Sequence, residues 1–169
     1  MGIRCFIIYV VVLLVMALFV LDAGALLNSR FLFDEKHQYA CPSLVFDEWK
    51  SFSQKLLAEN AFKSGVLSII DPCPLSIERA RRLTEKTGTV RLSAGDEAVI
   101  ALGIELKERR QRPIVLTDDF SVQNLLKHAK VRFQGVLRGE IAVAKTFANG
   151  HQMPKPSKPP KNSQTPTQH

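Results

Sequence analysis

The sequence has few cysteines and none in a metal-binding pattern. Its 169 residues include three, Cys5, Cys41 and Cys73, an odd number with no CxxC spacing. A disulfide framework of the kind found in small secreted proteins is therefore excluded, and a zinc site is not supported. This cysteine usage indicates a reducing compartment.

The motifs of several large enzyme classes are also missing. No Ser/His/Asp or Cys/His arrangement is legible, the four histidines share no motif, and neither a Walker loop nor a GxGxxG loop occurs. The sequence therefore gives no sign of a catalytic triad or of a glycine-rich nucleotide-binding loop.

Length and charge narrow the remaining classes. A chain of 169 residues with 46% hydrophobic residues can bury one ordinary core, which predicts a single folded domain. The net charge of +7 indicates a polyanionic partner, either nucleic acid or an acidic membrane surface. Composition does not choose between these two.

The N-terminus supports two interpretations. Residues 3–21 form an apolar run in which only Arg4 is charged, about the length of a membrane span or a signal-peptide core. The end of this run, ALFVL, also predicts a short buried strand that delivers Asp22, and Met16 lies just before it. A membrane helix ending at Leu21 would consume that strand. We therefore expect a cytoplasmic protein, with a membrane anchor as the alternative.

Apolar periodicity predicts alternating strands and helices. Strands are expected at residues 17–21, 66–70, 114–116 and 131–136, a loop at 37–40, and helices at 24–33, 41–61, 77–88, 96–112 and 121–129. Ser76 is the expected cap of the helix that ends at Gly88. The alternation predicts an α/β fold with a mostly parallel sheet between layers of helices, and ligand sites beyond the carboxyl ends of its strands.

Composition sets the expected domain boundaries. From about Gly150 the chain is rich in proline and lysine and has no acidic residue, which is typical of a disordered tail or a basic arm that touches RNA phosphates. We expect an apolar extension or misassigned start over residues 1–15, a folded domain over 16–142 and a basic tail over 143–169.

Four acidic residues fall at element boundaries, where side chains can converge: Asp22, Glu48, Asp96 and Asp119. Acidic residues at such boundaries also have structural alternatives. Asp96 completes a capping box with Ser93, Asp118 can cap the helix that follows Asp119, and Glu48 can lie on a solvated face. Asp22 directly follows an apolar strand, so its carboxylate needs a partner or a metal ion.

These segments, taken in order, resemble the motifs of a known family. FVLDAGALL, PSLVFDEWKS, TGTVRLSAGDEAVIALGIEL and IVLTDDFSVQN are similar to the motifs of the PIN-domain nucleases, over roughly residues 17–141. The archaeal Nob-type ribosome-maturation endonucleases resemble the chain most, and the VapC-type toxins come next. The resemblance implies a three-layer PIN-like fold.

The resemblance also implies site residues. Asp22, Glu48, Asp96 and Asp119 are expected to be catalytic, and Asp22, Asp96, Asp118 and Asp119 are expected to bind metal. Clustered carboxylates repel one another without cations, and oxygen-only ligands suit Mg²⁺ or Mn²⁺ better than zinc. Three features depart from the family: Thr89 stands where an acidic residue is usual, the N-terminal extension is unusual, and no zinc ribbon follows.

The functional expectation is a metal-dependent endoribonuclease, with small-subunit rRNA maturation as its role. A VapC-type toxin and a non-catalytic, membrane-tethered PIN module that binds RNA or a ribosomal partner are the alternatives. The partners expected are RNA, including pre-rRNA or the small ribosomal subunit, with a homodimer and a membrane contact through residues 3–21 left open. The RNA-binding candidates are Arg79, Arg82, Lys107, Arg110 and Asn124, for which solvated helix faces are the alternative.

Overall fold

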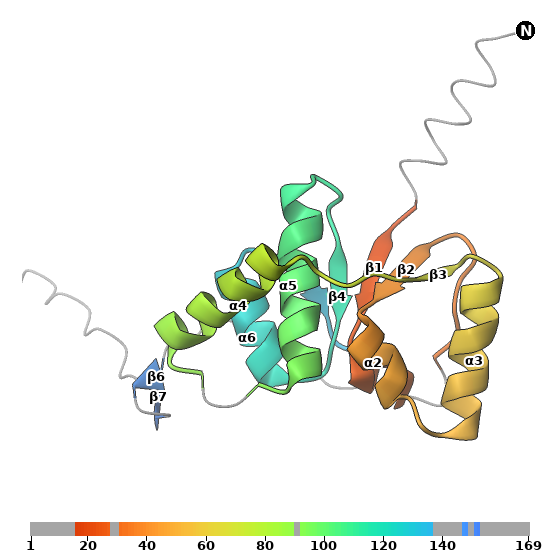
Figure 1. Cartoon of the computed structure of the whole chain (residues 1–169), viewed down its shortest axis with the longest axis horizontal. Helices are drawn as coiled ribbons and strands as arrows, with labels where there is room; N and C mark the ends of the chain where they lie inside the picture. Colours follow the sequence, from red (N-terminus) through yellow and green to blue (C-terminus); the bar gives the residue numbers. More distant parts are fainter. Residues whose placement is uncertain (1–15, 28–30, 90–91, 137–146, 149–150, 153–169) are drawn as a thin grey trace, which may run out of the picture.

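A five-stranded parallel sheet forms the centre of the protein. The computed structural model describes residues 16–27, 31–89, 92–136, 147–148 and 151–152 (Figure 1). The strands are β1 (Leu18–Leu21), β2 (Gln38–Cys41), β3 (Leu67–Ile69), β4 (Ile114–Leu116) and β5 (Arg132–Gln134), in the spatial order β3-β2-β1-β4-β5. All neighbours pair in parallel, so their carboxyl ends share one edge.

The helices flank this sheet, as the α/β prediction requires. They are α2 (Ser43–Glu48), α3 (Phe52–Lys63), α4 (Pro74–Thr87), α5 (Ala94–Glu108) and α6 (Phe120–His128), with a short 3-10 helix η1 (Ala23–Leu27) after β1. Figure 1 shows α4, α5 and α6 gathered beside β4, while α2 and α3 lie beside the other half of the sheet. The strand predictions at 17–21, 66–70, 114–116 and 131–136 are confirmed.

The first connection differs from expectation. The predicted loop at 37–40 is strand β2, and the predicted helix at 24–33 is only the 3-10 helix η1. QYAC has no β-branched residue, but Tyr39 stacks on Phe19 and packs edge-on against Phe33. Packing against the core therefore creates a strand that the local sequence does not indicate.

The expected helix at 41–61 is two helices. Backbone geometry breaks at Trp49, and Ser51 starts α3 anew by accepting a hydrogen bond from the Gln54 amide. Glu48 is therefore the last residue of α2 and does not lie early in a long helix, as the apolar spacing had indicated.

The helix predicted after Ser76 begins earlier. Its N-cap is Cys73 and its first residue is Pro74, while Ser76 is buried. The Glu105 carboxylate of α5 accepts the Cys73 amide proton at 2.8 Å, so a distant acid satisfies this helix start. Gly88 ends α4 with φ 65°, as predicted.

The structure bears on both ends of the chain. No helix in the described part is long and apolar enough to cross a membrane. Residues 18–21 are the central strand β1, which excludes one membrane helix over 3–21; residues 1–15 lie outside the described part. Within the expected tail, β6 (Phe147–Ala148) and β7 (His151–Gln152) pair antiparallel, and residues 153–169 lie outside the described part.

Candidate active site

Asp22 lies at the carboxyl end of the central strand and is almost fully buried. Its side chain accepts hydrogen bonds from the Ala23 amide at 2.7 Å and from the Thr117 hydroxyl at 2.5 Å. Its backbone amide donates to the Leu116 carbonyl at 3.1 Å, which continues the pairing of β1 with β4. Sheet register therefore fixes this carboxylate at the sheet edge.

The electrostatic surroundings of Asp22 identify its neighbours. Burial raises the pKa of Asp22 from 3.8 to about 6, the Thr117 hydrogen bond opposes that rise, and the negative charges of Asp96 and Asp119 add to it. Side chains from β1, the start of α5 and the start of α6 thus act on one another across this edge.

Thr117 joins two of these carboxylates. Its buried hydroxyl donates to Asp22 and accepts the Asp119 backbone amide at 3.1 Å. The buried amide of Gln123 in turn donates to the Thr117 carbonyl at 3.0 Å. The turn after β4 is therefore held from both sides.

Asp119 is the N-cap of α6. Its Oδ1 accepts the Ser121 amide at 2.6 Å and the Val122 amide at 3.4 Å. The cap expected at Asp118 is therefore Asp119 instead. Capping is compatible with metal binding because a carboxylate has four lone-pair sites. In the described part of the chain, its Oδ2 has no hydrogen-bond donor.

Asp96, like Asp119, caps a helix with one of its two carboxylate oxygens. The predicted capping box is confirmed: Asp96 Oδ2 accepts the Ser93 amide at 3.0 Å, and the Ser93 hydroxyl accepts the Asp96 amide at 3.0 Å. No donor among the described residues engages the other carboxylate oxygen. Asp96 and Asp119 thus each cap a helix with one oxygen and leave the second for a ligand.

Glu48 reaches the same region from α2. The indole nitrogen of Trp49 donates to the Ala23 carbonyl at 3.0 Å, which ties the end of α2 to the residue after Asp22. A Cβ atom added to Gly95 would lie 2.5 Å from Glu48 Oε1. The Glu48 carboxylate therefore fills the space that any larger residue would take on the first turn of α5, beside Asp96.

Asp118 points elsewhere. Its Oδ1 accepts the Val136 amide at 2.8 Å, which fastens the chain after β5. The sequence had placed Asp118 with Asp119 among the metal ligands. The structure gives Asp118 a hydrogen bond to the chain after β5, whereas Asp119 is the residue whose charge raises the pKa of Asp22.

The donor chemistry fits a hard divalent cation better than zinc, because all the converging atoms are carboxylate or hydroxyl oxygens. However, no group of three or more His, Cys, Asp or Glu side chains in the described ranges is close enough to hold a metal ion as it stands. Repulsion between the carboxylates is consistent with a site that a cation must draw together.

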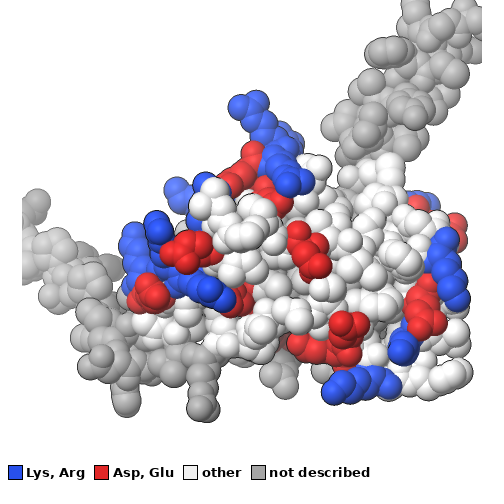
Figure 2. Space-filling model, in the orientation of Figure 1, with Lys and Arg blue, Asp and Glu red and all other residues white. Residues whose placement is uncertain are grey.

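The residues expected to bind RNA differ in their contacts and in their exposure. Arg79 pairs with Glu108, Arg82 pairs with Glu78 at 2.9 Å, and Figure 2 shows blue and red side chains mixed over α4. Lys107 donates to the Ala129 carbonyl at 2.6 Å. Asn124 is buried, with only 3% of its surface exposed, and its contact with RNA stays a prediction. Arg110 is exposed.

Sequence reasoning gave Thr117 no role of its own and did not single out Gly95. Thr117 was visible only as part of the motif IVLTDDFSVQN. A glycine directly before an acidic N3 residue was the only signal for Gly95. Nothing in the sequence marks Gln123 as buried.

Comparisons with known proteins give one consistent family. The model of the PIN domain of ribonuclease matches residues 19–106. Endoribonuclease Nob1 of Methanothermobacter thermautotrophicus is 32% identical over 72% of this chain and 70% of its own length. Endoribonuclease Nob1 of Pyrococcus abyssi is 32% identical over 63% of each. Ribonuclease VapC3 of Aeropyrum pernix is 30% identical over 70% of this chain and 88% of its own. The crystal structure of VapBC2 from Rickettsia felis superposes with a TM-score of 0.47 at 14% identity, over 70% of this chain and 98% of that one.

Proposed function

The chain belongs to the family of ribonuclease PIN domains, and from this premise we propose that it is an endoribonuclease that hydrolyses RNA with Mg²⁺ or Mn²⁺. One observation carries the assignment of the site. The buried Asp22 carboxylate lies at the carboxyl edge of the sheet, and the negative charges of Asp96 and Asp119, from two other elements, both raise its pKa. A phosphodiester can reach this edge only if cations offset their charge.

We propose a division of labour among the acids. Asp22, Asp96 and Asp119 hold the metal, through the oxygens that capping leaves unused and the remaining lone pairs of Asp22. When bound, the metal supplies charge stabilisation for the phosphate and lowers the pKa of a water molecule. Glu48, which is exposed at the end of α2, orients that water. Asp118 supports the end of β5 and does not ligate the metal.

The biological role splits into two proposals. Maturation of small-subunit rRNA follows from the Nob1 relatives, of which the chain spans 70% and 63%. A toxin-type ribonuclease is the second candidate, because the chain spans 88% of the VapC3 relative. Mapping the cleavage sites in a precursor rRNA and in total cellular RNA distinguishes the two roles.

The first prediction tests the site. Asp96→Asn should lower Mn²⁺-dependent cleavage of a structured RNA about 100- to 1000-fold, the usual loss when one stabilising group of a transition state is removed. Folding stability should stay within about 1 kcal/mol, because the asparagine oxygen can still accept the Ser93 amide proton. Initial cleavage rates and urea melts measure both.

Two controls sharpen the result. Asp118→Asn makes the same chemical change one residue before Asp119 and can keep its bond to Val136, so cleavage should persist. Ser93→Ala removes the cap at a cost of about 1 kcal/mol and should also leave cleavage intact. An Asp96→Asn protein that cleaves at the normal rate would refute the site, and a cleavage loss in Asp118→Asn would move the ligand assignment to Asp118.

A further inference from the structure

The amino ends of the strands carry a second charged surface, opposite the acidic edge. Arg110 and Arg112 lie between α5 and β4, Lys130 lies between α6 and β5, and Arg132 opens β5. All four are exposed, and within the described residues none has an ion-pair partner. We call these four residues the basic edge.

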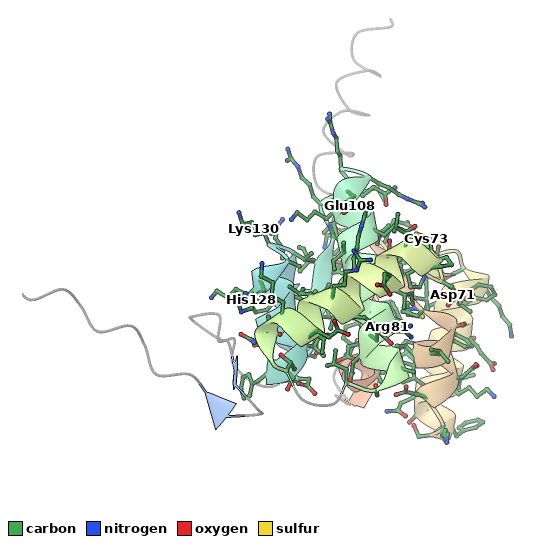
Figure 3. All side chains as sticks on the ribbon, turned by 60° about the vertical axis from the view of Figure 1, so that its left-hand side comes forward. Asp71, Cys73, Arg81, Glu108, His128 and Lys130 are labelled. Carbon is green, nitrogen blue, oxygen red and sulfur yellow. The ribbon has the colours of Figure 1, made fainter. Side chains whose placement is uncertain are left out.

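Specific contacts bring the two connections together. Lys107 near the end of α5 donates to the Ala129 carbonyl at the end of α6, at 2.6 Å. β4 and β5 are paired in parallel with Ile114 opposite Arg132, two residues after Arg112. Figure 3 shows the labelled Lys130 and Glu108 toward the same end of the molecule, where these helices finish.

The backbone gives an independent observation. Helices α3, α4, α5 and α6 each end in the same double hydrogen-bond pattern, in which a residue one or two positions beyond the helix has positive φ. After α3 and α4 this residue is Gly65 or Gly88, with φ 76° and 65°. After α5 and α6 it is Arg110 or Lys130, with φ 62° and 55°, and Arg112 has φ 50°. Glycine is the favoured residue here, because other side chains are strained.

The favourable interaction of a cation with a helix C-terminus is one reason to keep a basic residue there. This interaction does not explain the basic edge. Helices α3 and α4 have a cation in the last turn, Lys63 and Lys86, and still have glycine at the position with positive φ. Among the described residues, cations with positive φ occur only in the connections after α5 and α6, which lead into the neighbouring strands β4 and β5. Retained strain at a clustered, unpaired charge is typical of a binding surface.

We propose that the basic edge binds phosphates of the same single-stranded RNA that enters the acidic site. The choice of RNA as the ligand rests on the proposed function. The observations of unpaired charge and backbone strain are independent of that function. Asp96 lies on the first turn of α5 and Arg110 lies two residues beyond its end, so α5 separates them by about 20 Å. An RNA segment of several nucleotides therefore contacts both edges, and the basic edge attracts the strand that the carboxylates repel.

The second prediction tests this surface with a triple variant, Arg110→Gly, Arg112→Gly and Lys130→Gly. Glycine suits all three positive φ values, so charge is removed without loss of fold and the melting temperature should be unchanged or higher. The matched control is Lys55→Gln, Lys63→Gln and Lys86→Gln, which removes the same charge from exposed helical positions. Binding of a fluorescent single-stranded RNA is measured in EDTA across a salt series.

Loss of three phosphate contacts should lower the slope of log affinity against log salt by about two, and affinity about 100-fold near 0.1 M salt. The lysine control should change affinity by less than about threefold. An equal loss in both variants would overturn the proposal in favour of net charge alone. Unchanged affinity in the glycine variant would also overturn it, and would indicate an acidic protein as the partner. Binding in EDTA needs no catalysis, so a chain that fails to cleave RNA refutes the proposed function and leaves this test valid.

Discussion

The two edges of the sheet differ in how they hold charge. At the carboxyl edge, Asp22, Asp96 and Asp119 are tied by hydrogen bonds to a hydroxyl and to backbone amides, and Asp22 is buried. At the amino edge, Arg110 and Lys130 are exposed, without ion pairs in the described part, on strained backbone. The acidic edge is fixed in position and electrostatically unfavourable, whereas the basic edge is solvated and conformationally unfavourable. Charges held against the local preference at both ends are consistent with one polyanion that contacts each.

The third prediction, with the largest effect on stability, tests the electrostatic strain of the acidic edge. Because burial raises the pKa of Asp22 in the folded state to about 6, the folded protein retains the proton that the unfolded chain releases. The stabilisation that protonated Asp22 gives the folded state is complete below pH 3.8 and is lost as pH rises through 6. In EDTA at pH 7, Asp22→Asn should therefore raise the free energy of unfolding by as much as about 3 kcal/mol.

Urea denaturation in EDTA between pH 4 and pH 7 measures this effect. The wild type should lose stability across that interval, while the Asp22→Asn variant should lose much less. Asp47→Asn, the same change at an exposed neighbour of Glu48, should alter stability by less than about 0.5 kcal/mol. A less stable Asp22→Asn protein at pH 7, with a wild type that is flat over this interval, would show that the hydrogen bonds outweigh the burial.

The fourth prediction breaks the hydrogen bonds that hold the acidic edge. Thr117→Val keeps the side-chain shape but removes the donor to Asp22 and the acceptor of the Asp119 amide. We expect a loss of about 2 kcal/mol, because buried polar groups are left unsatisfied, and a further rise of the Asp22 pKa. Thr117→Ser should retain both bonds and most of the stability. Equal losses in the valine and serine variants would mean that methyl packing, not the hydroxyl, matters at this position.

Much of the acidic edge was predictable from sequence because each carboxylate sits where an element begins or ends. Asp22 after an apolar strand and Asp96 in a capping box have local signals, and the structure places both as expected. Glu48 lost its expected place early in a helix because Trp49 bonds the Ala23 carbonyl and ends α2. Asp118 and Asp119 are adjacent, so only tertiary contacts separate the residue facing Asp22 from the residue facing Val136.

The remaining errors have the same cause. Strand β2 exists because Tyr39 packs against Phe19 and Phe33, and α4 begins at Pro74 because Glu105 accepts the Cys73 amide proton. Both are contacts between distant parts of the chain. The basic edge was also hidden, because the positive φ values of Arg110 and Lys130 have no sequence signal when glycine is absent. The arginines of α4 appeared equivalent to them until their ion pairs were seen.

The fifth prediction has the smallest effect and asks whether Glu48 belongs to the acidic edge. In Gly95→Ala, the new Cβ would meet Glu48 Oε1 at 2.5 Å and its Cδ at 3.4 Å. Since these atoms are the far end of a flexible side chain, Glu48 should swing away, and stability should hold or rise by up to about 1 kcal/mol as helical glycine is replaced. If Glu48 orients the water, cleavage by the Gly95→Ala protein should fall about tenfold. In a protein that already carries Glu48→Gln, adding Gly95→Ala should then lower the cleavage rate no further.

The second glycine of α5 provides the matched comparison. In Gly103→Ala the new Cβ meets Val115 Cγ2 at 3.1 Å and Val131 Cγ1 at 3.3 Å, inside the core. That variant should lose stability, because packed side chains must move, and cleave at a normal rate. Urea melts and cleavage rates should therefore separate the two variants. Gly95→Ala should lose activity and keep its stability, whereas Gly103→Ala should lose stability and keep its activity. If Gly95→Ala cleaves as fast as the wild type, Glu48 is a solvated residue at the end of α2, and the acidic edge consists of the three aspartates alone.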